Sequence, residues 1–374
     1  MEKLHVCLVC PDGRNFSLIK QTGTLALALN QAGLKVSLII GQVETSALAN
    51  LHPEISTKHI YRENGVLPKK WRQHIHMFRQ LRKHLHRDPT IDIVHLMSCR
   101  WPYALLAHIP HRLQMPVMAN AQLESDINPK AIPFLKRPFH VRALKCIHPL
   151  IVNSHHMLDV AKKNGLEHVA LIATGVQTDQ FKPVLSKRPT RRELGLPEKA
   201  TLVCCMADIA PENAQLEALE RCLPLSEERQ MLFIGNAPDK EYLARLEERL
   251  EQKGCLPYAH FLDAVMNPED YLKASDLFIL LGGIEQRHST ILEAQSAGLP
   301  VVLAPSPSAL MLSNGNRCGV VLYPNNPLAK QAFEKLIADA TYRQGRAINT
   351  RPYVQKEFGF KKMVQAYVKL YTSF

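Results

Sequence analysis

The sequence lacks an uninterrupted apolar run of about 18 residues, the length that a helix needs to span a bilayer. Its first ten residues also lack the long apolar stretch and small-residue cleavage site of a signal peptide, so we interpret them as a first strand. We therefore expect a cytoplasmic protein. Apolar residues make up 46% of the chain, which excludes a wholly disordered protein. A length of 374 residues favours two domains.

Metal-binding patterns are missing as well. The 17 histidines and nine cysteines form neither an HExxH motif nor a paired Cys/His spacing. Cys7 and Cys10 form a CxxC, but they fall in the predicted first strand, where residues three apart point to opposite faces. We therefore expect reduced thiols in the core, no metal and no cofactor.

Acidic residues are scarce in the first half of the chain. Residues 1–180 carry 22 Lys and Arg against 12 Asp and Glu, whereas the remainder is nearly balanced and the net charge is +12. This asymmetry predicts that the first half meets an anionic partner. Nucleic acid is not expected, because no recognition motif accompanies the charge.

The segment Lys69–Arg87 contains no acidic residue and has the spacing of a helix. Its large apolar residues fall on one helical face: Trp71, Ile75, Phe78, Leu81 and Leu85. Two interpretations stay open, because such a helix can lie on an anionic membrane surface or pack on the core with a solvated basic face. A second basic stretch, Lys136–Lys145, lies in the same half. Peripheral attachment to a membrane is therefore one expectation.

Short apolar segments alternate with amphipathic ones throughout the chain. The apolar segments are Leu4–Cys10, Val36–Ile40, Ile91–Leu96, Pro116–Ala119, Leu150–Val152, Val169–Ile172, Thr201–Met206, Met231–Gly235, Ala259–Leu262, Leu277–Leu281, Val301–Ala304 and Gly319–Tyr323. The alternation predicts an α/β protein with two parallel sheets, each covered on both faces. Phe181–Pro197, rich in Pro and basic residues, separates the two series as a linker. Ligands of such domains bind at the carboxyl ends of the strands.

The most informative segment is Leu280–Val302. A buried strand leads into a Gly-Gly turn and a polar loop, followed by a helix that Ser289 could cap. Glu285 lies in the loop and Glu293 lies eight positions later in the helix, so both carboxylates can face one cleft. The free backbone N–H groups at the helix start would suit a phosphate. The alternative is an ordinary solvated helix with two surface carboxylates.

This segment resembles the Glu-x7-Glu motif of the retaining glycosyltransferases of family 4, which have the GT-B fold. The family pattern continues with "EA" and "AxGxPVV", met here by Glu293-Ala294 and Ala297–Val302. Further matches follow the family's order along nearly the whole chain. They are Gly33–Val36, Asp92–His95, Val152–Ser154, Thr174–Pro183, Leu194–Pro197 and Phe233–Pro238.

The resemblance implies two Rossmann-like domains that face a central cleft. The first domain would comprise residues 1–182, completed by a C-terminal helix at about 352–374, and the second would comprise residues 183–351. A nucleotide-sugar would bind to the second domain, with Glu293 on the ribose hydroxyls and Glu285 on the donor sugar. The phosphate of the donor would help to deprotonate the acceptor on the same face, so the anomeric configuration would be retained.

Several positions depart from the family pattern. In the loop that resembles "GRLxxxKG", Asp208 stands where Arg is expected and Asn213 stands where Lys is expected. The loop after the first strand offers only Gly13 instead of a Gly-Gly pair. Gln122 stands where many members have His, and an amide can hydrogen-bond an acceptor hydroxyl but cannot take its proton.

The missing phosphate cations need replacement if the protein uses a nucleotide-sugar. Arg287 and His288 directly follow the Glu285 loop, and Arg14 lies in the opposing loop. The expected catalytic residues are Glu285 and Gln122. The expected donor-binding residues are Glu293, Arg287, His288, Ser289, Thr290, Gly13, Asp208, Asn213 and Gly235.

The resemblance thus predicts an enzyme that transfers a hexosyl group from a nucleotide-sugar to a glycan or a lipid-linked acceptor. Polysaccharide or lipopolysaccharide biosynthesis in the cell envelope would be its setting. The alternative is a weakly active or non-catalytic binding or scaffold protein with the same fold. Asp208 and Asn213 favour that alternative, whereas the intact pair Glu285 and Glu293 opposes it.

Overall fold

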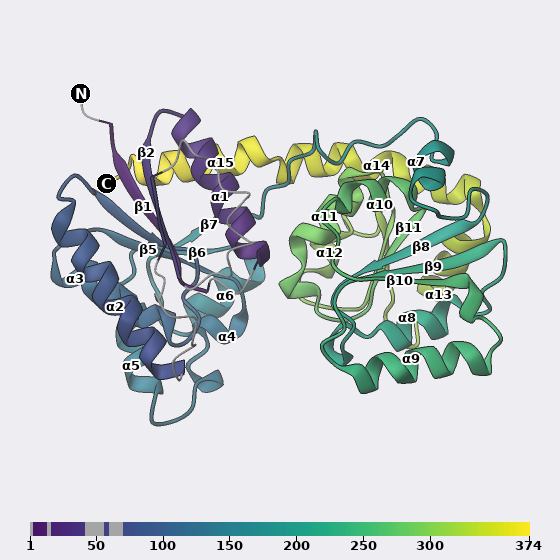
Figure 1. Cartoon of the computed structure of the whole chain (residues 1–374), viewed down its shortest axis with the longest axis horizontal. Coiled ribbons are helices and arrows are strands. Elements are labelled where there is room, and N and C mark those ends of the chain that lie inside the picture. The colour runs from purple at the N-terminus through teal and green to yellow at the C-terminus, as the bar shows by residue number, and fades with distance from the viewer. Residues whose placement is uncertain (1–2, 13–15, 42–55, 60–69) are drawn as a thin grey trace. The chain divides into compact units, whose positions relative to one another are not determined.

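The computed structural model describes residues 3–12, 16–41, 56–59 and 70–374 (Figure 1). The chain divides into two compact units. The first unit contains Met1–Ala173 together with Met363–Phe374, and the second contains Thr174–Lys362. The chain thus passes from the first unit to the second after residue 173 and returns to the first unit after residue 362. The division expected from the sequence placed these two boundaries after residues 182 and 351.

The first unit is built on a sheet of seven parallel strands in the order β3-β2-β1-β4-β5-β6-β7. The strands are β1 (His5–Cys10), β2 (Lys35–Ile40), β3 (Ser56–His59), β4 (Ile93–Leu96), β5 (Val117–Ala121), β6 (Leu150–Val152) and β7 (Val169–Leu171). The helices are α1 (Phe16–Gln31), α2 (Lys70–Arg87), α3 (His108–Arg112), α4 (Glu124–Ile127), α5 (Arg137–Leu144) and α6 (His155–Lys163). The edge strand β3 was not predicted, because its side chains carry no apolar period.

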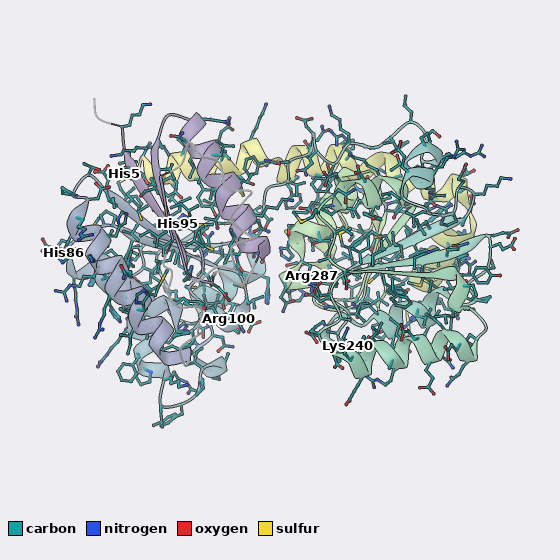
Figure 2. The ribbon with its side chains drawn as sticks, viewed as in Figure 1. His5, His86, His95, Arg100, Lys240 and Arg287 are labelled. Atoms are coloured by element: carbon teal, nitrogen blue, oxygen red, sulfur yellow. The ribbon has the colours of Figure 1, made fainter. Side chains whose placement is uncertain are left out.

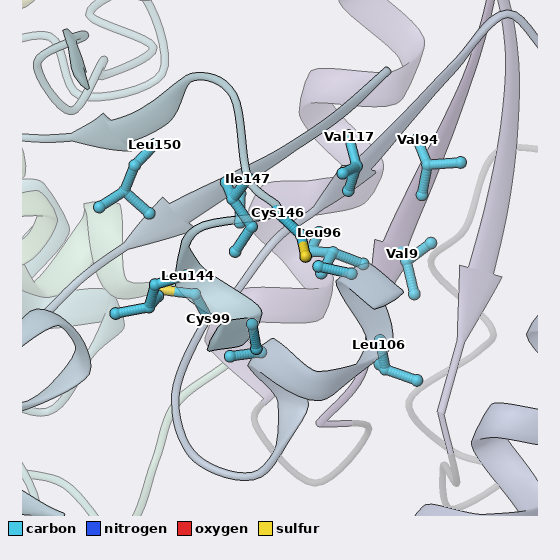
Figure 3. Close-up of a cluster of buried hydrophobic side chains, with 14 of the residues drawn as sticks. Val9, Val94, Leu96, Cys99, Leu106, Val117, Leu144, Cys146, Ile147 and Leu150 are labelled. Atoms are coloured by element: carbon cyan, nitrogen blue, oxygen red, sulfur yellow. The ribbon is translucent and has the colours of Figure 1, made fainter. Parts of the chain in front are cut away.

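One cluster of the core of the first unit lies between the sheet and the helices on one of its faces. Apolar side chains from β1, β4, β5 and β6 meet those of α2, α5 and α6, and Figure 3 shows Val9, Val94, Val117 and Leu150 among them. The strands are buried because helices cover them, as expected for a parallel sheet. All nine cysteines are buried and unpaired by disulfides.

Helix α2 packs against this core. Met77, Leu81 and Leu85 are 5%, 0% and 4% exposed, whereas Ile75 is 41% exposed. The core therefore occupies the apolar face of the described part of α2. The Arg and Lys side chains of this part are exposed to solvent, as is His86, which Figure 2 labels. The side chain of Trp71 lies outside the described residues. None of the described helices combines the length and apolarity needed to cross a bilayer.

The last helix, α15 (Phe360–Tyr371), reaches the first unit through a buried polar network. Nδ1 of His95 lies 2.6 Å from the hydroxyl of Tyr371, and its Nε2 lies 3.0 Å from Oδ1 of Asn120. Burial lowers the pKa of His95 to about 4, although the hydrogen bond to Asn120 opposes the shift. The imidazole is therefore neutral at physiological pH and joins α15 to β4 and β5.

The second unit has a sheet of six parallel strands in the order β10-β9-β8-β11-β12-β13. The strands are β8 (Thr201–Met206), β9 (Arg229–Ile234), β10 (Ala259–Leu262), β11 (Leu277–Leu280), β12 (Val301–Leu303) and β13 (Gly319–Val321). The helices are α7 (Arg188–Glu193), α8 (Gln215–Cys222), α9 (Lys240–Gln252), α10 (Pro268–Ala274), α11 (His288–Ser296), α12 (Ala309–Leu312), α13 (Pro327–Ala338) and α14 (Ala340–Phe358). The α/β class with two parallel sheets is confirmed.

Candidate functional site

A pocket of about 470 Å³ lies at the carboxyl ends of β8, β11 and β12 in the second unit. In a parallel α/β sheet this edge is where ligands bind. Three loops form its wall, and the lining residues are Glu212, Asn213, Leu281, Gly282, Gly283, Ile284, Glu285, Gln286, Arg287, Ala304, Pro305 and Ser306. The loop of Glu285 and the loop of Asn213, which were selected separately from the sequence, thus meet at one pocket.

The Gly-Gly turn after β11 allows the loops after β8 and β11 to touch. Gly283 has a φ of +61°, and a Cβ there would lie 2.4 Å from Oδ1 of Asn213. A Cβ on Gly282 would lie 2.3 Å from the carbonyl oxygen of Glu212. A side chain on Gly282 would push the two loops apart, because it would meet backbone. A side chain on Gly283 is disfavoured by the positive φ and would displace the amide of Asn213.

The carboxylate of Glu285 is held from two sides. The backbone N–H and the hydroxyl of Ser308 donate to it at 3.0 and 2.7 Å. Nε2 of His288 lies 3.4 Å from Oε2 of Glu285, so a protonated imidazole would form an ion pair there. Burial by itself would raise the pKa of Glu285, but His288 and Ser308 lower it to about 2. Glu285 is therefore ionised at neutral pH and suits accepting hydrogen bonds, not donating a proton.

Helix α11 begins two residues earlier than a cap at Ser289 would give. A short 3₁₀ turn at Ile284–Gln286 leads directly into it, so Arg287 occupies the capping position and Ser289 lies inside the first turn. The expectation that Ser289 caps the helix is therefore wrong. His288 is buried, while Ser289 and Thr290 are half-buried in the first turn.

Glu293 lies in the middle of α11 and is half-buried. It follows Ser289 by four positions, so the two residues share one face of the helix.

The end of this helix is fixed to the rest of the second unit. Arg351 on α14 donates from Nη1 to the carbonyl oxygens of Ser296, Thr178 and Phe181 at 3.1, 2.6 and 3.0 Å.

Arg287 contacts the two residues of the β8 loop that depart from the family pattern. Its Nε donates to Oδ1 of Asn213 at 3.1 Å, and its Nη2 lies 3.6 Å from Oδ2 of Asp208 (Figure 2 labels Arg287). Asn213 is buried and also donates from Nδ2 to the carbonyl oxygen of Asp208 at 2.7 Å. The site thus has a cation on the loop after β11, whereas the family pattern has its cations on the loop after β8.

Gly235 is required by the backbone rather than by a side-chain contact. It has a φ of +152°, and a Cβ there would lie 2.4 Å from the carbonyl oxygen of Ala207. The end of β9 can therefore pack closely on the end of β8, beside Asp208.

In the first unit, Gln122 follows β5 and is half-buried. Its backbone N–H donates to Oδ2 of Asp126 at 3.0 Å, and the N–H of Leu123 donates to the same atom at 2.9 Å. Asp126 is buried, and burial raises the pKa of this carboxyl although the two N–H groups oppose the shift. Asp126 thus fixes the loop that carries Gln122. Gly13 and Arg14 lie outside the described residues.

Two residues of the site were missed from the sequence. Ser308, which binds Glu285, lies 23 positions later on another loop, and only its place after a predicted strand could have indicated it. Ser306 lines the pocket, and its buried hydroxyl has no partner within the described part of the chain. Over residues 3–12, 16–41, 56–59 and 70–374, no group of three His, Cys, Asp or Glu side chains is arranged to hold a metal.

Two family models match the chain. The model described as Glycosyltransferase Family 4 matches residues 20–180, and the model described as Glycosyl transferases group 1 matches residues 186–351. The second match contains the pocket and helix α11, and the first contains Gln122.

Individual proteins resemble the chain more weakly. The D-inositol 3-phosphate glycosyltransferase of Streptomyces scabiei is 24% identical over 77% of this chain and 69% of its own length. The lipopolysaccharide core biosynthesis mannosyltransferase LpsB of Rhizobium meliloti is 23% identical over 54% of this chain and 60% of its own length. The crystal structure of HepE from Anabaena in complex with UDP and glucose has a TM-score of 0.80 at 16% identity, with 99% of both chains covered. At that identity the structural likeness shows the fold.

Proposed function

Since the chain belongs to the family 4, group 1 glycosyltransferases, we propose that it transfers a hexosyl group from a nucleotide-sugar to an acceptor hydroxyl with retention of configuration. The observation that carries the proposal is the pocket of the second unit, where Glu285 and Arg287 lie together and the helix of Glu293 begins. HepE, which has a similar structure, was crystallised with UDP and glucose.

Glu293 would accept hydrogen bonds from the two ribose hydroxyls of the nucleotide. A carboxylate with two oxygens suits such a pair, and its place on α11 leaves it half-buried. Glu285 would accept hydrogen bonds from the hydroxyls of the donor sugar. Because Ser308 and His288 fix its carboxylate, little conformational freedom would be lost on binding.

Arg287 and the first turn of α11 would hold the diphosphate. The free N–H groups of a helix start favour an anion, and Arg287 adds a formal charge beside them. Asn213 orients the guanidinium through Nε, so its two terminal nitrogens can face a phosphate. We propose that these groups replace both the missing cations of the β8 loop and a metal ion.

In the transfer step, the acceptor oxygen bonds to the anomeric carbon while the bond from that carbon to the phosphate oxygen breaks. The acceptor proton passes to the departing phosphate oxygen, on the same face of the sugar. Gln122 in the first unit would hydrogen-bond the acceptor hydroxyl. Two relatives are described as acting on D-inositol 3-phosphate and in lipopolysaccharide core biosynthesis, and we propose a cell-envelope glycan or a lipid-linked glycan as the acceptor here.

A panel of nucleotide-sugars in a thermal-shift assay, followed by donor hydrolysis, tests the proposal. At least one donor should raise the melting temperature and be hydrolysed slowly without an acceptor. Proton NMR of the released sugar should then show the donor's anomeric configuration. In Glu285→Gln, donor hydrolysis should fall by at least about 100-fold while nucleotide binding changes little. An inverted product would refute retention.

A second function, a non-catalytic binding protein, rests on one observation. Asp208 lies 3.6 Å from Arg287 and partly neutralises the cation that the diphosphate would need. If no nucleotide-sugar binds, this second function replaces the enzyme.

A further inference from the structure

The first unit exposes an apolar cluster where the sequence had indicated only a basic stretch. Phe134, Leu135 and Phe139 are 78%, 82% and 56% exposed, at the start of α5 and in the turn before it. Large apolar side chains that are adjacent in the chain and this exposed are unusual on a protein without a partner. We name Ile132–Lys145 the apolar-basic segment.

Cations surround the cluster. Lys136, Arg142 and Lys145 are exposed, and the guanidinium of Arg137 lies 5.9 Å from the centre of the Phe134 ring. The chain contains no Asp or Glu from Ile127 to Leu158. The segment therefore combines exposed apolar groups with several positive charges and no acidic residue of its own, the combination that binds anionic bilayer surfaces.

Helix α5 is fixed in an orientation that keeps the cluster outside. His140, Ala143 and Leu144 on its inner face are 0%, 0% and 3% exposed, so the opposite face with Phe139 and Arg142 looks outward. Both α5 and α2, which Figure 1 labels, pack on the 3₁₀ helix Tyr103–Ala107. The exposed basic residues of α2 thus add to the positive charge near the segment.

We propose that the apolar-basic segment docks the first unit on a membrane rich in anionic phospholipid. Phe134, Leu135 and Phe139 enter the boundary between headgroups and acyl chains, and Lys136, Arg142 and Lys145 contact the lipid phosphates. A glycan partner is less suited to this surface, because Leu135 offers neither a stacking ring nor a hydrogen bond. The membrane-binding segment is therefore the turn before α5, and not the apolar face of α2, which the core occupies.

The segment is tied to the loop of Gln122. Nε2 of His140 donates to the carbonyl oxygen of Asp126 at 2.8 Å, and the carboxylate of Asp126 binds the N–H groups of Gln122 and Leu123. Docking through α5 would therefore bring the bilayer surface close to the residue proposed to meet the acceptor. This last consequence rests on the proposed function, whereas the docking itself does not.

Vesicle co-sedimentation of the full chain, without donor or acceptor, tests the docking. Vesicles of equal parts phosphatidylglycerol and phosphatidylcholine should bind the protein at low salt, and phosphatidylcholine vesicles should bind it at least about tenfold less. The variant Phe134→Ser/Leu135→Ser should lose about tenfold or more in partitioning, and Lys136→Glu/Arg142→Glu a similar factor. The matched control is Leu328→Ser/Ile348→Ser, which removes two side chains that are 74% and 67% exposed in the second unit and should change nothing.

The changed side chains are exposed, so the melting temperatures of all three variants should equal that of the parent. A Phe134→Trp variant gives a second measurement, since brominated acyl chains should quench its added fluorescence. Equal binding by the parent and Phe134→Ser/Leu135→Ser would overturn the proposal, as would absence of quenching. Equal binding to neutral and anionic vesicles would overturn the role of the cations. Nucleotide affinity, measured separately, should be the same in every variant, so a failure of the proposed enzyme activity is distinguishable.

Discussion

Asp208 is predicted to weaken donor binding, and its replacement by Asn should strengthen it. The side chain of Asp208 is 49% exposed and its Oδ2 lies 3.6 Å from Nη2 of Arg287. This distance is long for a hydrogen bond, so the contact is mainly electrostatic. The orientation of Arg287 comes instead from Asn213, whose Oδ1 accepts from Nε at 3.1 Å. Asp208→Asn should therefore leave Arg287 in place and remove one negative charge.

The magnitude follows from Coulomb's law. A diphosphate with about two negative charges, bound to Arg287, would lie roughly 7 Å from Asp208. In a dielectric near that of water, which suits a half-exposed carboxylate, the repulsion is about 1 kcal/mol. Removing it should tighten binding about fivefold.

Isothermal titration with a nucleotide-sugar that binds the parent protein, at low and at high salt, measures this change. The gain should shrink at high salt because mobile ions screen the exposed carboxylate. Glu241→Gln serves as the control, since Glu241 is an exposed carboxylate on α9 that does not line the pocket. Weaker binding by Asp208→Asn would refute the reasoning and show that Asp208, not Asn213, holds Arg287 in position.

Three further predictions concern single side chains. Glu293→Ala should weaken nucleotide binding by about 1–3 kcal/mol, the cost of losing charged hydrogen bonds, and unchanged affinity in calorimetry would remove Glu293 from the site. Arg287→Ala should reduce donor affinity more than Arg14→Ala does, and Asp208→Arg should increase donor affinity. If titration shows a smaller loss for Arg287→Ala than for Arg14→Ala, the assignment of Arg287 to the diphosphate is contradicted. The folded-state pKa of His95 is lowered from 6.5 to about 4, so the unfolded chain binds its proton first, and stability is lost as pH falls through this range. In urea unfolding, the free energy of unfolding should fall by about 3 kcal/mol between neutral pH and pH 4 because of His95, and His95→Gln should not show this fall. The same dependence of the free energy of unfolding on pH in both proteins would contradict a buried neutral His95.

The strands and the position of the site at their carboxyl ends could be predicted from the sequence because they depend on local pattern, whereas the order of the strands in each sheet was not predicted. The buried strand β11 consists of apolar residues throughout, and β1 does so after His5, while the Gly-Gly turn after β11 requires a special backbone. The polar edge strand β3 has no such pattern. The helix α2 was recognised from its spacing, but its environment was not, because Leu81 and Leu85 would serve equally in a core or in a bilayer.

The contacts within the site depend on residues that are distant in sequence. Glu285 and Glu293 were selected from a spacing of eight, whereas Ser308 reaches Glu285 only after β12 has returned the chain to the same edge. The contact between Asp208 and Arg287 joins two loops, and neither loop alone indicates it. Likewise, a basic stretch could be seen in the sequence, but the exposure of Phe134 is a property of how α5 packs.

Titration of the purified protein with nucleotide-sugars is the most direct test of the central claim. The account predicts that at least one of them binds to the parent protein, that Asp208→Arg binds it more tightly, and that Glu293→Ala binds it about fivefold or more weakly. If no nucleotide-sugar binds to the parent protein or to Asp208→Arg, the pocket at β8, β11 and β12 is not a donor site, and the claim of a glycosyl transfer is contradicted.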